Sequence, residues 1–420
     1  MKLKIDFLGG AREVGRSAVL VSFGNKRILL DYGSTPSARP RFPKRISPDA
    51  IDAVILSHCH IDHSGMIPYL FMGGRPRLIA TGITLEFTYL LLRDFYKLNG
   101  KYLPWDLSDL ERTMKLAQPY SYDLTFYING IYVKMLNASH VPGSASILLE
   151  ENGIKVWYTG DVNMIETHLI EPMDVPESAD IIICEATYGN RDHPPRHTEE
   201  MRLVKAVKEV VDEGGTVLIP AFSVGRAQEI VCILREYGYT GKIWMDGMAQ
   251  QATFILLAFP EFTKDYARVR WYMKSAKYVV SNRQRKKIVK KPGVIIAPAG
   301  MLEGGWAWYY LMHIYSKEKN GIFFVSYQAE NTKGRYILEN RKLPPLLGNK
   351  EIKARIEYFE LSSHSGRQQL LDMIKKINSI QKIFVVHADN DVAVEFAEKL
   401  REMGFDSFAP EFGEHFILKK

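Results

Sequence analysis

The segment His58–His63, with the sequence HCHIDH, places four side chains that can bind a metal within six residues. It follows a short apolar run, Ala53–Ser57, which is typical of a buried strand, and we expect a helix to begin at Ser64. Functional side chains collect at the carboxyl ends of strands in α/β folds. Imidazoles and a carboxylate directed at one point are the ligands that a borderline-soft divalent cation prefers. The segment therefore predicts a metal site, with Cys59 as a packed small side chain between two ligands.

Three further candidate ligands, His140, Asp161 and His387, each follow an apolar run that reads as a strand. A lone histidine after a strand is more often structural, but here the same position recurs after several strands. The combined set is large enough for two metal ions. Two cations about 3.5–4 Å apart can hold both the attacking and the leaving oxygen of a phosphoryl displacement.

The elements around these residues change in character along the chain. The first 190 residues are predicted to form short strands and tight turns with few helices, including hairpin turns at Gly24-Asn25 and Asn152-Gly153. From about residue 195 strands alternate with helices, for example at Glu199–Asp212 and Ala227–Tyr237, which indicates an α/β unit with a parallel sheet. The absence of a low-complexity linker favours an inserted domain.

The composition of the chain excludes several classes of protein. Its 420 residues are 46% hydrophobic and 25% charged, which excludes disorder, collagen and a coiled coil. Three distant cysteines exclude a disulfide scaffold and a cysteine-only zinc site. No stretch reaches about 18 consecutive apolar residues and no signal peptide is visible, so we expect a cytoplasmic protein with no membrane partner.

The net charge of +7 has a local source. Ten Lys and Arg residues and no acidic residue lie between Arg268 and Lys291, with Trp271, Tyr272 and Tyr278 interleaved. This pattern suits contacts with phosphates and base stacking on a single-stranded nucleic acid. A solvated basic face is the alternative.

The motifs resemble those of a known family. HCHIDH with the spaced His140, Asp161 and His387 resembles the metallo-β-lactamase superfamily, and His364 in LSSHSG and His387 look like the second and third motifs of its β-CASP branch. The resemblance covers nearly the whole chain and is closest to archaeal relatives of the cleavage and polyadenylation specificity factor endonuclease. Further segments that carry it are Gly9–Ser17, Leu29–Gly33, Glu185–Gly189, Ile219–Glu229, Ala297–Leu302 and Ser326–Arg335.

The resemblance implies an α/β fold, in which residues 1–189 and 356–420 form a metallo-β-lactamase αββα sandwich. Residues 190–355 would form an inserted α/β β-CASP domain with a parallel sheet flanked by helices. Two segments depart from the family pattern: Ser365-Gly366 stands where an acidic residue is usual, and Pro298–Met301 replaces the usual Ser-Pro-Gly-Met.

The resemblance also implies a role for each site residue. His364 would be the general acid, oriented by Glu185, and Asp31 would brace the metal loop. Asp62 would also orient the attacking hydroxide, and Arg226 and Arg335 would contact RNA phosphates. Two Zn²⁺ per chain are implied, one held by His58, His60 and His140, the other by Asp62, His63 and His387, with Asp161 bridging both.

The function implied is that of a zinc-dependent ribonuclease on single-stranded RNA, leaving 5′-phosphate and 3′-hydroxyl ends in RNA 3′-end processing, maturation or decay. We expect an endonuclease, although 5′-to-3′ exonuclease action also occurs among relatives, and a homodimer is implied. His387 favours RNA, because the DNA-repair branch carries valine there. The alternatives are a DNA nuclease of that branch, a small-molecule metallo-hydrolase, which would not need the insertion, and a non-catalytic scaffold, which would have lost ligands.

Overall fold

The computed structural model describes residues 2–419 and divides into two compact units. The first unit comprises residues up to Glu166, Glu171–Asp192 and Ser363 onward. The second comprises Thr167–Ile170 and His193–Ser362.

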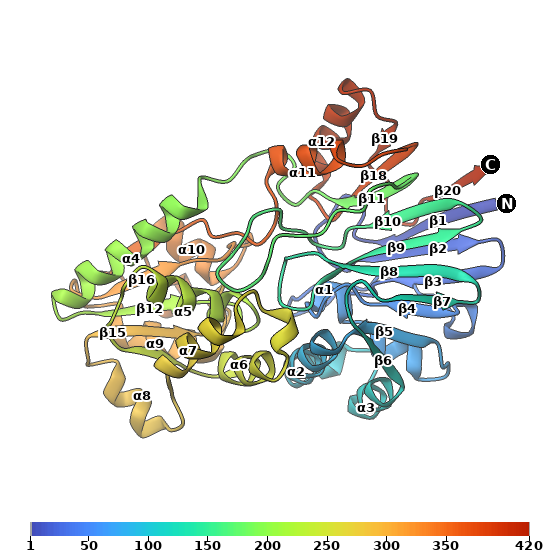
Figure 1. Ribbon diagram of the computed structural model, residues 1–420. Helices are drawn as coiled ribbons and strands as arrows, with labels where there is room; N and C mark the ends of the chain where they lie inside the picture. The colour runs from blue at the N-terminus through green and yellow to red at the C-terminus, as the bar shows by residue number, and fades with distance from the viewer. Residues whose placement is uncertain (1, 420) are drawn as a thin grey trace. The chain divides into compact units, whose positions relative to one another are not determined.

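The first sheet of the first unit has seven strands in the order β20-β1-β2-β3-β4-β5-β6 (Figure 1). Its first four strands pair antiparallel and the rest pair parallel, and the two ends of the chain lie side by side because β1 pairs with β20. The strands are β1 (Lys2–Gly9), β2 (Ala18–Phe23), β3 (Lys26–Leu30), β4 (Ala53–Ile55), β5 (Arg77–Thr81), β6 (Ala117–Tyr120) and β20 (His415–Lys419).

The second sheet of this unit also has seven strands, in the order β19-β18-β11-β10-β9-β8-β7. The pairs from β19 to β10 are parallel and those from β10 to β7 are antiparallel. The strands are β7 (Thr125–Ile128), β8 (Ile131–Asn137), β9 (Ala145–Glu151), β10 (Ile154–Tyr158), β11 (Ile181–Glu185), β18 (Lys382–Val386) and β19 (Ser407–Phe408).

Alternation of side chains along these strands produces four layers. Val19 and Val21 of β2 enter a core shared with the inner face of the second sheet. Leu20, between them, points the other way and packs with α2 (Gly82–Asn99) and α3 (Leu107–Leu116). The outer face of the second sheet packs in the same manner against α11 (Arg367–Lys375) and α12 (Asn390–Glu402). The first unit is therefore an αββα sandwich, as the sequence predicted.

The second unit is built on a six-stranded parallel sheet in the order β14-β13-β15-β12-β16-β17. Its strand–helix alternation confirms the prediction of an α/β unit (Figure 1). The strands are β12 (Thr216–Pro220), β13 (Ile243–Met245), β14 (Lys277–Tyr278), β15 (Gly293–Ala297), β16 (Gly321–Phe324) and β17 (Arg355–Tyr358). The helices are α4 (Arg196–Asp212), α5 (Arg226–Glu236), α6 (Met248–Ala258), α7 (Tyr266–Ser275), α8 (Asn282–Ile288), α9 (Gly305–Ile314) and α10 (Lys333–Asn340).

Two sequence predictions about the first unit are wrong. The helix after the HCHIDH segment does not begin at Ser64; α1 spans Ile61–Ser64, so two candidate ligands lie inside it. The early region also contains the 18-residue helix α2, where the sequence predicted few helices. The side chain of Thr81 begins α2 by accepting a hydrogen bond from the Thr84 N–H, a helix-capping signal that the strand-based prediction overlooked.

A buried carboxylate organises the sheet edge of the second unit. Asp246 follows β13 and is fully buried, with Arg285 donating to both of its oxygens at 2.7 and 2.8 Å and the Tyr310 hydroxyl donating at 2.6 Å. Both oxygens of Asp246 accept hydrogen bonds, so removing Arg285 would leave a buried charge without its partner.

Replacing Asp246 by alanine is expected to lower the free energy of unfolding by about 3–5 kcal/mol, the usual cost of breaking a buried ion pair. Urea unfolding followed by circular dichroism measures this. The matched control is Glu339→Gln, which removes an exposed ion pair with Arg335 and should cost less than about 1 kcal/mol. A loss below about 1 kcal/mol for Asp246→Ala would show that the pair contributes no more than a surface pair.

Candidate metal centre

Seven side chains of the first unit converge at the carboxyl ends of its strands. His58, His60, Asp62 and His63 follow β4, and His140, Asp161 and His387 follow β8, β10 and β18. All come from one unit, although their sequence positions span the inserted second unit.

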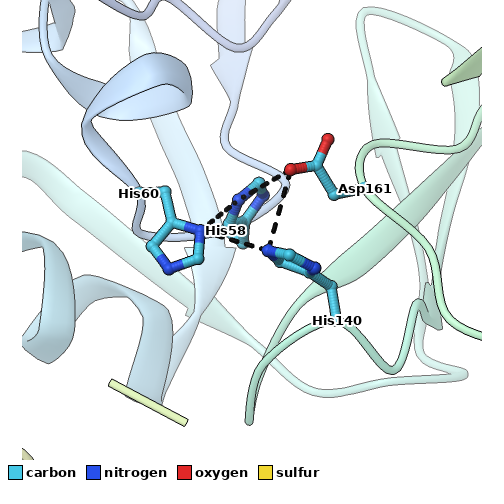
Figure 2. Close-up of side chains that lie close together, drawn as sticks. All are labelled: His58, His60, His140 and Asp161. Carbon is cyan, nitrogen blue, oxygen red and sulfur yellow. Dashed lines mark hydrogen bonds and ion pairs between the residues drawn. The ribbon is translucent and has the colours of Figure 1, made fainter. Parts of the chain in front are cut away.

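The first group of ligand atoms joins three histidines and one carboxylate. His60 Nδ1 lies 3.1 Å from both His58 Nε2 and His140 Nε2. Asp161 Oδ2 lies 3.4 Å from His58 Nε2 and 3.7 Å from His140 Nε2. Figure 2 shows the four side chains pointing toward one another. Such a set of nitrogen and oxygen donors suits a divalent cation of the zinc type.

The second group lies on the other side of Asp161. Asp62, His63 and His387 have ligand atoms within 4.8 Å of one another. Asp161 Oδ1 lies 3.3 Å from His63 Nε2 and 3.4 Å from His387 Nδ1. The two oxygens of Asp161 thus face different groups of candidate ligands.

Two atoms in this centre indicate that a cation fits it. His63 Nε2 and Asp161 Oδ1 are buried and have no hydrogen-bond partner among residues 2–419. Buried polar atoms are nearly always partnered, because leaving one unsatisfied is costly. A metal ion bound by both atoms would satisfy them.

The pKa values of two of the histidines agree with a ligand role, and that of the third responds to nearby carboxylates. Burial lowers the pKa of His58 and of His140 well below the ordinary value, so both imidazoles are neutral, the form that binds metals. Burial also lowers the pKa of His63, but the charges of Asp161 and Asp31 outweigh it and raise the pKa well above the ordinary value. Without a metal, the carboxylates therefore favour the protonated, positively charged form of His63. A bound cation would supply that positive charge instead.

Partners behind the ligands fix their orientation. Asp31 Oδ2 lies 2.7 Å from His63 Nδ1 and accepts hydrogen bonds from the hydroxyls of Ser57 and Tyr158. The carbonyl of Ser363 lies 2.9 Å from His140 Nδ1. Such outer partners set the tautomer and the direction of a ligand ring. The sequence predicted the bracing position of Asp31 but gave no sign of Ser57, Tyr158 or Ser363, because no spacing rule marks them.

The backbone of α1 is held by the two N-terminal segments that carry family motifs. The N–H of Ser17 donates to the Asp62 carbonyl, and the N–H of Tyr32 donates to the His63 carbonyl. Gly33 is required at this contact, because a Cβ there would lie 1.7 Å from the Asp62 carbonyl oxygen. The close approach explains why a glycine ends the Leu29–Gly33 segment.

A histidine–carboxylate pair lies beside the first group. His364 Nδ1 is 2.9 Å from Glu185 Oε1, and Glu185 is buried and also accepts from the backbone N–H groups of Val162 and Thr187. The His364 ring centroid lies 4.5 Å from that of His140. Burial lowers the pKa of His364, but the charge of Glu185 and its hydrogen bond raise the pKa to about 9.

Ser365 joins the His364 segment to the loop that carries Asp161. Its N–H donates to the Val162 carbonyl, and its hydroxyl accepts from the Met164 N–H. At this departure from the family pattern, a fully buried serine therefore contacts the residues next to a candidate ligand.

The candidate RNA contacts lie in the second unit. Arg226 opens α5 and is only 8% exposed. Arg335 lies in the first turn of α10, is exposed, and pairs with Glu339. Both arginines belong to the second unit, whereas the seven metal-ligand candidates belong to the first.

Three family models together match most of the chain. The Beta-lactamase superfamily domain matches residues 26–221, the Beta-Casp domain residues 227–337, and the Zn-dependent metallo-hydrolase RNA specificity domain residues 349–410. With the αββα sandwich and the relatives below, they show that the chain belongs to the β-CASP ribonucleases of the metallo-β-lactamase superfamily.

Individual relatives match nearly the whole chain. RNase aCSPSF2 of Saccharolobus solfataricus is 36% identical over 100% of this chain and 86% of its own length. Probable RNase MJ4 of Methanocaldococcus jannaschii is 33% identical over 98% of this chain and 99% of its own length. The transcription termination factor FttA of the same organism is 35% identical over 96% of this chain and 69% of its own length. A crystal structure of a protein of unknown function from Enterococcus faecalis V583 has the same fold, with a TM-score of 0.66, 14% identity and full coverage of both chains.

Proposed function

We propose that the chain is a zinc-dependent ribonuclease that hydrolyses RNA phosphodiester bonds. The observation that carries this proposal is the Asp161 carboxylate, which directs one oxygen to each of two groups of candidate ligands. The names of the relatives, two RNases and a transcription termination factor, support RNA as the substrate.

The proposed ligands divide between two Zn²⁺ ions. His58, His60 and His140 would hold one ion, and Asp62, His63 and His387 the other, with Asp161 shared. Such a pair supplies Lewis acidity toward a phosphodiester and makes a water molecule nucleophilic at neutral pH. The chain contributes neutral imidazoles, a bridging carboxylate and burial, which strengthens every charge interaction in the site.

The proposed acid is His364. Attack of water on phosphorus breaks the bond to the 3′ oxygen, which must then gain a proton, while the phosphate stays on the 5′ end of the downstream product. Glu185 fixes the ring through Nδ1, so Nε2 is the nitrogen that would deliver this proton. Asp62 is proposed to orient the attacking oxygen as well as to bind metal.

Several finer points stay predictions. They are the endonucleolytic preference, a 5′-to-3′ exonuclease activity, a role in RNA 3′-end processing, maturation or decay, and the phosphate contacts of Arg226 and Arg335. A homodimer and a cytoplasmic location also stay predictions. No helix within residues 2–419 is long and apolar enough to span a membrane. We further propose that the two units are the metallo-β-lactamase domain and the β-CASP domain, with boundaries near residues 190 and 355.

Incubation of the purified protein with internally labelled and 5′-labelled RNA tests the function. We expect fragments with 5′-phosphate and 3′-hydroxyl ends, complete inhibition by a chelator, and recovery on adding Zn²⁺, because the ligand set needs a cation. Single-stranded DNA and a thioester are run in parallel. Absence of RNA cleavage by zinc-loaded protein would contradict the proposal, and preferential cleavage of DNA or the thioester would favour the alternatives.

A further inference from the structure

One face of the second unit carries an unusual arrangement of charge along α8 and the turn after it. Three of the five basic residues, spaced three and four residues from the first, share one face of α8, and the other two lie in the turn after the helix. All five are exposed and together line one open hollow of about 580 Å³. We call this surface the α8 stripe; its residues are Arg283, Lys286, Lys287, Lys290 and Lys291.

The charges of the α8 stripe have no acidic partners. Within residues 2–419, none of the five side chains forms an ion pair or a hydrogen bond with a carboxylate, whereas nearby Arg268 pairs with Glu236 and Asp265. Like charges one helical turn apart repel and destabilise the helix. A surface that bears this repulsion without internal compensation is suited to a polyanion.

The opposite side of α8 is anchored. Arg285 binds both oxygens of buried Asp246, and its guanidinium lies 3.5 Å from the ring centroid of Trp306. Ile288 and Val289 are buried in the core of the unit. A helix of seven residues is unstable alone, so these contacts hold α8 in place and fix the direction of the stripe.

The basic segment differs from its sequence prediction in one respect. Tyr272, expected to stack on bases, is 6% exposed and donates a hydrogen bond to Glu236, so this expectation is wrong. No aromatic residue lines the hollow of the α8 stripe. The surface therefore offers only positively charged side chains, which bind phosphates irrespective of base sequence.

We propose that the α8 stripe is a docking surface for the sugar–phosphate backbone of RNA, separate from the residues that hold the metals. This inference rests on the proposed function, which makes RNA the substrate. Five cations fixed along one face would neutralise several successive phosphates and release their counterions. The stripe would then hold long RNA chains while the metal centre acts on a single bond.

The test uses three variants of the whole zinc-loaded chain, two of which each lose five positive charges at different positions. The first replaces all five stripe residues by glutamine. A second stripe variant keeps the charge: it carries Arg283→Lys and replaces each of the four stripe lysines by arginine. The control replaces five exposed lysines of the same unit by glutamine: Lys205, Lys317, Lys319, Lys342 and Lys350.

Binding is measured by fluorescence anisotropy with a 20-nucleotide phosphorothioate RNA of mixed sequence, which resists hydrolysis, over a range of salt concentrations. We expect the stripe glutamine variant to bind at least about tenfold more weakly. The plot of the logarithm of the binding constant against the logarithm of salt concentration should become less steep by about 3, since each neutralised phosphate contributes about 0.7 for single strands. The control should change affinity less than about threefold, and the charge-keeping variant should bind as the unaltered protein does.

Hydrolysis of bis(p-nitrophenyl) phosphate separates the two proposals. This small diester cannot extend along the stripe, so its turnover should be the same in all variants, while KM for long RNA rises in the stripe glutamine variant alone. Equal weakening in both glutamine variants, or an unchanged salt slope, would overturn the docking surface and leave the nuclease proposal intact. Binding to vesicles containing phosphatidylserine with no preference for RNA would also overturn it. Failure of the unaltered protein to cleave RNA would contradict the proposed function itself.

Discussion

Replacing Asp161 by alanine is expected to remove most RNA cleavage and, under the proposed two-zinc centre, to deplete both metals. Asp161 is 2% exposed and lies between two histidine groups, with Oδ2 toward one and Oδ1 toward the other. Its loss removes the carboxylate that contacts histidines of both groups. Because metal ions supply several kcal/mol of transition-state stabilisation, we expect the rate to fall by about a thousandfold or more.

The measurement pairs two readings on the same preparation: zinc per chain by elemental analysis and cleavage of labelled RNA. The control is Asp123→Ala, which removes an exposed carboxylate of the same unit that pairs with Lys134. It should keep the zinc content and the activity of the unaltered protein. Two zinc ions per chain retained in Asp161→Ala would contradict the bridging role.

Replacing His364 by alanine is expected to lower kcat by about 10²–10⁴-fold, the usual contribution of a general acid, and to leave the zinc content unchanged. The reason is that His364 contacts Glu185 at 2.9 Å, and this carboxylate fixes its ring beside the metal groups. KM for RNA should change little, because the proton is needed in the transition state and not for binding.

The matched control is His193→Ala, which removes a histidine–glutamate pair of the same 2.9 Å separation, formed with Glu360 in the second unit. It should leave kcat within about threefold. Loss of zinc from His364→Ala in proportion to its loss of activity would instead make His364 a ligand, a reading that its proximity to Asp161 and Glu185 permits.

The place of the candidate ligands in the fold could be predicted from sequence, because a short apolar run is enough to locate the end of a strand. Apolar runs mark strands, and functional side chains collect just after the carboxyl ends of strands. His140, Asp161 and His387 lie within three residues of the ends of their strands. The αββα layers and the parallel sheet of the second unit could be predicted from the family resemblance and from the strand–helix alternation.

The remainder required three-dimensional contacts. Tyr158 reaches Asp31 across 127 residues, and the Ser363 carbonyl reaches His140 across 223, so no window of sequence contains both partners. The ten charges between Arg268 and Lys291 looked uniform in sequence. In the fold, Arg268 and Arg285 pair with carboxylates, and five of the other eight line one open hollow.

The pairing of β1 with β20 and of β11 with β18 has a consequence for synthesis of the chain. Lys2 pairs with Lys419, and the third motif histidine, His387, follows a strand that joins its sheet only after the whole second unit has been made. The ribosome therefore releases the inserted unit, with its own sheet and core, before either sheet of the sandwich can close. A nascent chain lacks His364 and His387 until the whole second unit has been made, so the proposed nuclease stays unassembled up to that point of its synthesis.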